Sequence, residues 1–119
     1  MTQMNLGIAL ELHGERTEGA EGLDPLTRAI AAYVAALEVY TRDASPVDWA
    51  MTQGNLAVAH LTLARRQTGA ERGSSLAQAL AAVDSALEVF EPETMGAYRA
   101  LSLHDRDLIL AEMGKGGDG

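Results

Sequence analysis

The chain repeats itself with a period of about 50 residues, and this repeat constrains the fold more than any other feature. Residues 1–40 and 51–90 align with about 18 of 40 positions identical. The segment 1–9 begins Met-Thr-Gln-x-Asn-Leu and returns at 51–59, and the Ala-rich segment 29–39 returns at 79–89. Self-similarity at this period is typical of stacked repeats, in which each unit buries its apolar face against its neighbour. Such arrays mostly build binding surfaces, so the repeat favours a binding function.

Helix-forming residues dominate both copies, and no alternating strand pattern occurs. The apolar spacing predicts five helices, at about 2–13, 24–42, 46–66, 74–90 and 92–114. Pro25 and Pro46 follow capping residues, Asp24 and Ser45, and therefore indicate helix starts. Ser74 or Ser75 is expected to cap the fourth helix.

We therefore predict an all-α fold of tandem antiparallel helical hairpins. The hairpins form one domain over 1–114, with repeats at about 1–45 and 46–91, a capping helix at about 92–114 and a disordered tail at 115–119. In the last helix, Asp107-Leu108-x-x-Ala111 matches Asn55-Leu56-x-x-Ala59 if the spacing stretches to about 52 residues. The predicted core contains Leu6, Ala9, Ala29, Ile30, Tyr33, Ala36, Leu37, Trp49, Leu56, Ala59, Ala79, Leu80, Val83, Ala86 and Leu87.

Composition narrows the class of function. Nine Lys and Arg against seventeen Asp and Glu give a net charge of −8, which disfavours nucleic acid as a partner. The chain has no cysteine, which suits a reducing cytoplasm, and it has no apolar run long enough to span a membrane. We predict no cofactor, no membrane partner and a cytoplasmic location.

Short motifs within the repeat resemble the tetratricopeptide repeat (TPR) family, in a long-period, bacterial-type variant. Leu6-Gly7-x-x-Leu10 resembles the family's Leu-Gly-x-x-Tyr, and Ala29-x-x-x-Tyr33-x-x-Ala36 resembles its Ala, aromatic and Ala at the same spacing. The second copy has Leu56-Ala57-x-x-His60 and Ala79-x-x-x-Val83-x-x-Ala86. The period of about 50 residues exceeds the family's 34, and Gln3 and Gln53 stand where the family often has Trp.

The resemblance implies a TPR-like superhelix of two repeats with a C-terminal capping helix, a scaffold for protein–protein interaction. Its first, third and fifth helices would line a concave groove that takes a peptide or a partner helix. The groove candidates are Met4, Asn5, Ile8, Glu11, Met51, Asn55, Val58, Leu61, Arg106 and Asp107, with Met1, Gly54 and Leu110 beside them. In the family, an Asn at the position of Asn5 and Asn55 commonly bonds the peptide backbone, although both residues could equally tie neighbouring helices together.

The first and third helices carry no cation at these positions, so the expected ligand is apolar, with basic flanks that would meet Glu11. The methionines Met4 and Met51 would give an adaptable lining, or could simply pack in the core. An alternative function is self-association, as an oligomerisation segment of a larger multi-repeat signalling protein, and a homodimer is one form of it.

An enzyme is not predicted. His13, His60 and His104 show no zinc-binding spacing, and the chain contains no nucleophile elbow or phosphate-binding loop. His60 is expected to be packed with one nitrogen hydrogen-bonded. His104, Asp105 and Asp107 could donate to a metal, but they read more simply as solvated residues.

Overall fold

The computed structural model describes residues 23–116, and all regular structure in that range is helical. The four helices are α2 (Leu23–Val39), α3 (Pro46–Ala64), α4 (Gly69–Val89) and α5 (Gly96–Gly116). No strand occurs among these residues. The predicted helix at 2–13, its candidates Met1, Met4, Asn5, Ile8 and Glu11, and the predicted core residues Leu6 and Ala9 lie outside the described residues.

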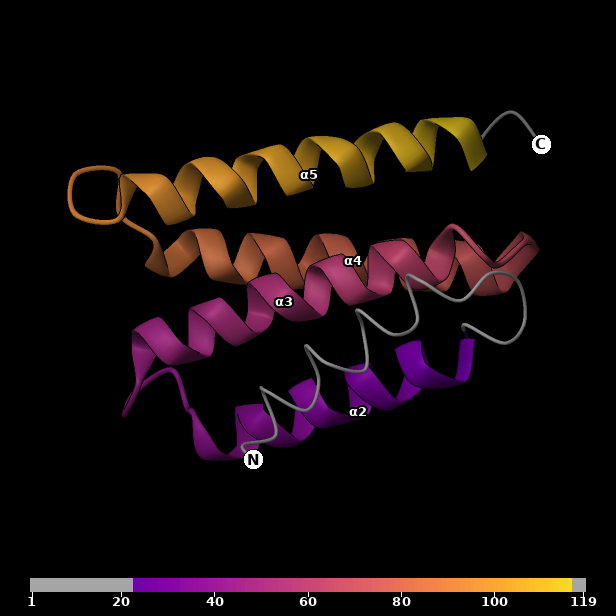
Figure 1. Cartoon of the computed structure of the whole chain (residues 1–119). Helices are drawn as coiled ribbons and strands as arrows, with labels where there is room; N and C mark the ends of the chain where they lie inside the picture. The colour runs from indigo at the N-terminus through magenta and orange to yellow at the C-terminus, as the bar shows by residue number, and fades with distance from the viewer. Residues whose placement is uncertain (1–22, 117–119) are drawn as a thin grey trace.

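Consecutive helices run antiparallel and form a compact stack (Figure 1). The helix α3 is central, because it contacts α2, α4 and α5, whereas α4 also contacts α5. This alternation makes α3 and α5 parallel to each other. The prediction of an all-α fold is confirmed at this level.

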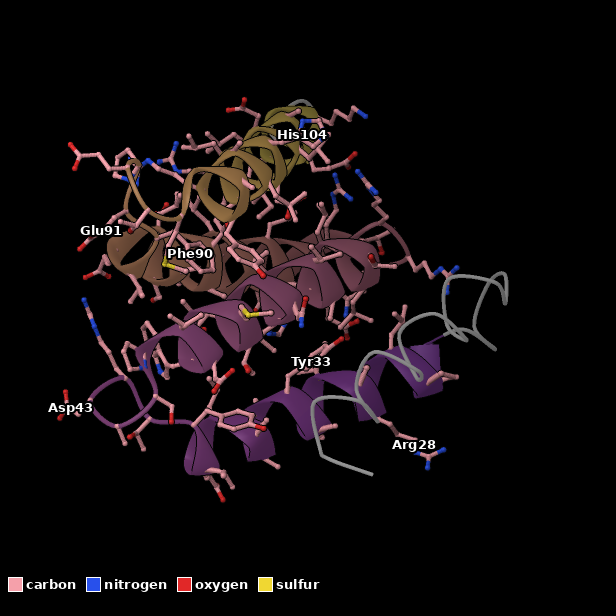
Figure 2. The ribbon with its side chains drawn as sticks, turned by 60° about the vertical axis from the view of Figure 1, so that its left-hand side comes forward. Arg28, Tyr33, Asp43, Phe90, Glu91 and His104 are labelled. Atoms are coloured by element: carbon pink, nitrogen blue, oxygen red, sulfur yellow. The ribbon has the colours of Figure 1, made fainter. Side chains whose placement is uncertain are left out.

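Small residues bring the helices together. Ala29, Ala36, Ala59, Ala79 and Ala86 are all buried, which lets helix backbones approach closely. The larger predicted core residues Tyr33, Leu56 and Val83 are also buried, whereas Ile30, Leu37, Trp49, Leu80 and Leu87 are partly buried. Figure 2 shows Tyr33 on α2 directed toward α3. The core also contains Leu26, Phe90 and Ile109, which are not among the predicted core residues.

The start of α3 matches the sequence prediction. Pro46 occupies the first turn, where its missing N–H costs nothing, and Asp48 lies beside the positive end of the helix dipole. Ser45 is at the N-cap position, but its side chain makes no capping hydrogen bond. Instead, the Ser45 N–H donates to the Thr41 carbonyl oxygen at 2.8 Å, which closes the preceding turn.

The start of α4 corrects the sequence prediction. The helix begins at Gly69, with Thr68 in an extended conformation at the N-cap, so Ser74 and Ser75 lie inside the helix and cap nothing. Gly69 has a φ of +61°, a conformation that glycine adopts without strain. Ser75 is buried, and its hydroxyl donates to the Gln67 amide oxygen at 2.6 Å. Side-chain contacts of this kind support the helical conformation of residues 69–73, where the glycines had indicated a loop.

The bounds of α2 and α5 also differ from those predicted. The helix α2 ends at Val39 instead of Arg42, and α5 begins at Gly96 because residues 91–95 form a turn. In that turn the Met95 N–H donates to the Glu91 carbonyl oxygen at 2.9 Å, as Ser45 does to Thr41. The helix α5 continues to Gly116, so the first two residues of the predicted disordered tail are helical, and residues 117–119 lie outside the described range.

Within residues 23–116, no helix is both long enough and apolar enough to cross a membrane.

Candidate functional site

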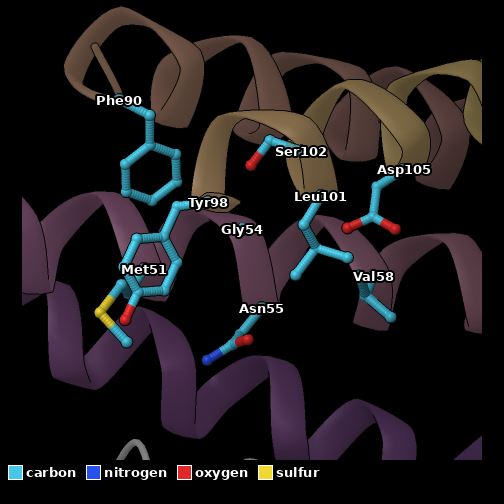
Figure 3. A pocket seen from close by; sticks show the side chains of 9 residues that line it. All are labelled: Met51, Gly54, Asn55, Val58, Phe90, Tyr98, Leu101, Ser102 and Asp105. Carbon is cyan, nitrogen blue, oxygen red and sulfur yellow. The ribbon is translucent and has the colours of Figure 1, made fainter. Parts of the chain in front are cut away.

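A cavity of about 240 Å³ lies between α3 and α5, next to the end of α4 (Figure 3). Its lining is mostly apolar and comes from both parallel helices. The lining residues are Met51, Gly54, Asn55 and Val58 of α3, Phe90 after α4, and Tyr98, Leu101, Ser102 and Asp105 of α5.

Aromatic rings form one end of the cavity. The Phe90 and Tyr98 rings stack with centroids 5.4 Å apart and an interplanar angle of 22°. Phe90 is buried, whereas Tyr98 is 46% exposed and forms the rim. The Arg99 guanidinium donates to the Phe90 carbonyl oxygen at 3.1 Å, which ties the start of α5 to the end of α4. The aromatic end is therefore held in place by both stacking and hydrogen bonding.

A carboxylate lies at the other end. Figure 3 shows Asp105 beside Val58, on the far side of Leu101 from the two rings. Burial raises the pKa of Asp105, and the nearby His104 partly opposes this effect. No hydrogen bond or salt bridge joins the Asp105 or Asn55 side chain to another residue of the described range. Within residues 23–116, both side chains therefore lack a hydrogen-bonding partner.

The other two partly buried carboxylates of the described range, Asp84 and Glu112, are paired. Asp84 accepts a hydrogen bond from the Arg106 Nε at 2.7 Å. Glu112 accepts from Arg72 at 2.8 Å, and this bond is the largest cause that lowers the Glu112 pKa to about 2. Asp105 is thus the charged group among the cavity-lining residues, and it faces the cavity without a cation.

The structure brings together some of the predicted groove residues. Met51, Asn55 and Val58 line the cavity, and Gly54 lies between them. Leu61 does not, because it is buried in the core cluster formed mainly by α3 and α4.

The candidates predicted on α5 lie elsewhere. Arg106 pairs with Asp84, while Asp107 and Leu110 are exposed, and none of the three lines the cavity. The residues of α5 that do line it were missed, and the register of the repeat explains why. The helices α3 and α5 begin at residues 46 and 96, so their positions correspond at a spacing of 50 residues instead of 52. This register pairs Asn55 with Asp105, and Met51 with Leu101.

A second correspondence supports the same register. Thr52 and Ser102, fifty residues apart, are both buried hydroxyl residues. The Thr52 hydroxyl donates to the Asp48 carbonyl oxygen at 2.8 Å, within its own helix. The sequence therefore contained a signal for the residues of α5 that line the cavity. It consisted of similar, not identical, residue types fifty positions apart, such as Thr52 and Ser102.

The histidine predictions have mixed outcomes. His60 is buried as expected, but its Nδ1 is buried without a hydrogen-bond partner. Burial lowers the pKa of His60. Its ring lines a shallower hollow of about 330 Å³ that α2, α3 and α4 share. Among residues 23–116, no group of three or more potential metal ligands comes together.

Comparisons of this chain with models of known protein families, with curated proteins and with solved structures find no match.

Proposed function

We propose that this protein is a binding module that recognises a segment of another polypeptide in the cavity between α3 and α5. The observation that carries the proposal is the exposed apolar rim of that cavity. Leu101 is 60% exposed and Tyr98 is 46% exposed, and both line the apolar cavity. Exposed apolar surface that is continuous with a hollow is typical of interaction sites.

The size and chemistry of the cavity support a polypeptide ligand over a cofactor. Its volume of about 240 Å³ is below the range of about 300–1,000 Å³ that is usual for small-molecule sites. A space of this size suits one or two side chains of a larger partner. Aromatic residues and methionine, which are enriched at protein interfaces, supply much of the lining. We also propose no enzymatic activity and no cofactor, because the sequence contains no nucleophile elbow and no phosphate-binding loop.

We also propose that the helices form a TPR-like stack, in which α3 and α5 are groove-lining helices. The constant spacing of 50 residues between the starts of α3 and α5 supports this arrangement, as does the burial of Ala29, Ala36, Ala79 and Ala86 at helix contacts. Residues 23–116 would then contain the second helix of one repeat, a complete repeat and a closing helix.

The outward surface of α5 argues against the alternative of a continuing array. In the register of 50 residues, Asp107 stands at the position of Ala57, which is fully buried against its neighbours. Asp107 is exposed, and a neighbour that covered it as Ala57 is covered would bury its charge. We therefore place the partner in the cavity and treat α5 as the closing helix.

The proposal can be tested by selecting binders from a displayed library of random 16-residue peptides. We expect the wild-type protein to enrich a related set of sequences and the Leu101→Arg variant to lose them, because the new charge would occupy the apolar rim. The matched control is Leu103→Arg, since Leu103 is a 42% exposed leucine on the same helix that does not line the cavity.

Circular dichroism of all three proteins checks that the helices persist. Equal enrichment on wild type and Leu101→Arg, or no enrichment on wild type, contradicts the proposed function.

A further inference from the structure

The cavity has two chemically different ends, and the helices fix the distance between them. Tyr98 at the aromatic end and Asp105 at the carboxylate end are seven residues apart on α5, which corresponds to about 10.5 Å along the helix axis. Met51 and Val58 mark the same interval on the parallel helix α3. Figure 3 shows the two ends on opposite sides of Leu101.

The carboxylate end lacks the partner that the other partly buried carboxylates of the described chain possess. Asp84 and Glu112 each form a salt bridge with an arginine. Asp105 is half-buried beside apolar side chains and forms none. A partly desolvated carboxylate gains more from an opposite charge than a fully exposed one, because water screens the attraction less.

We propose that the partner segment carries two anchors at a defined separation: a large apolar side chain that packs on Phe90 and Tyr98, and a lysine or arginine whose cation pairs with Asp105. This inference rests on the proposed function and specifies the chemistry of its partner. Two anchors about 10 Å apart are spaced seven positions apart in a helical segment, or about three positions apart in an extended one.

Charge and shape both favour this ligand over a neutral one. The net charge of −8 attracts a basic segment and raises its rate of encounter. The stem of a lysine or arginine is apolar, so it can lie along Leu101 and Val58 while its charged end reaches Asp105. The Asn55 side chain offers a further acceptor from the facing helix.

The test uses the random-peptide library on three proteins: wild type, Asp105→Asn and Asp107→Asn. Asp107 is the matched control, because it is an exposed aspartate two positions away that does not line the cavity. We expect wild type and Asp107→Asn to enrich peptides that pair an aromatic residue or leucine with Lys or Arg at the stated spacing. Asp105→Asn should retain the apolar preference and lose the basic one.

Affinities of one enriched peptide then measure the pairing directly. We expect replacement of its basic residue by norleucine to weaken binding to wild type about five- to tenfold, and to change binding to Asp105→Asn less than twofold. The loss on wild type should shrink as salt concentration rises, because ions screen the pair.

The outcomes separate this inference from the function on which it rests. Enriched peptides that need Leu101 but lack a basic residue, or an equal norleucine effect on wild type and Asp105→Asn, overturn the inference and leave the binding function standing. No enrichment on the wild-type protein removes both.

Discussion

Replacement of Glu112 by Gln should destabilise the fold in a pH-dependent way. Glu112 lies near the end of α5, where Arg72 of α4 donates both to its carboxylate at 2.8 Å and to its backbone carbonyl at 2.9 Å. A second Arg72 nitrogen donates to the Ala64 carbonyl oxygen at 3.1 Å. The ion pair therefore joins the ends of three helices, and Glu112→Gln removes its charge while it keeps the shape of the side chain.

The size of the expected loss of stability follows from the pKa of Glu112. Its lowering from 4.5 to about 2 corresponds to at most about 3 kcal/mol of folding free energy. Two of the cations that contribute, Arg65 and Lys115, have side chains 46% and 71% exposed, so water screens them. We therefore expect Glu112→Gln to lower the free energy of unfolding by about 1–2 kcal/mol at pH 7.

The sign of the pH dependence is fixed because the folded state holds the carboxylate ionised. Stability from Glu112 is fully present above pH 4.5 and is lost as the pH falls toward 2. Urea unfolding monitored by circular dichroism at pH 7 and pH 2.5 measures the difference between wild type and variant. Glu93→Gln, at an exposed position with no ion pair in the described structure, is the control. A difference that stays the same at both pH values refutes this reasoning.

Three further predictions concern groups that are fully or partly buried. Tyr33→Ala should lower the free energy of unfolding by about 3–5 kcal/mol in urea titrations, since Tyr33 is fully buried in the largest core cluster. His60→Leu should reduce the loss of stability as the pH falls below 6.5, because burial lowers the folded pKa and the unfolded chain takes up the proton first; equal pH profiles for wild type and variant count against it. Asp105→Asn should raise the melting temperature at pH 7, since burial raises the pKa of an unpaired carboxylate, and the gain should disappear as acid protonates Asp105. A lower melting temperature at pH 7 contradicts the view that this charge is kept for a ligand.

The sequence predicted the helical class and most of the buried alanines because both depend on local periodicity. Ala29, Ala36, Ala79 and Ala86 recur at helical spacing, and each is buried where that spacing places it. Pro46 identified the start of α3 because proline is restricted by its own ring, whatever the tertiary contacts.

Positions that depend on contacts between distant segments could not be predicted in this way. Ser74 and Ser75 indicated a helix cap, but α4 starts earlier, where Ser75 bonds Gln67 and Arg72 reaches α5. Glycine at 69 and 73 indicated a loop, yet one supplies the left-handed start of α4 and the other is tolerated within it.

The residues of α5 that line the cavity were also not predicted from the sequence. Alignment by residue identity favoured Asp107 as the counterpart of Asn55, because Asp107-Leu108 resembles Asn55-Leu56. The turns before α3 and α5 close with equivalent hydrogen bonds fifty residues apart, and they set the register that brings Asp105 into the cavity instead. Backbone geometry fixed this position, and residue identity alone did not reveal it.

Binding of a partner segment in the cavity between α3 and α5 can be observed through nuclear Overhauser contacts between an enriched peptide and the isotopically labelled wild-type protein. We predict contacts from the apolar residue of the peptide to Tyr98 and Met51, and from its basic residue to the region of Val58 and Asp105. Contacts confined to the hollow around His60, or to the outer face of α5 at Leu103 and Leu110, would contradict the account.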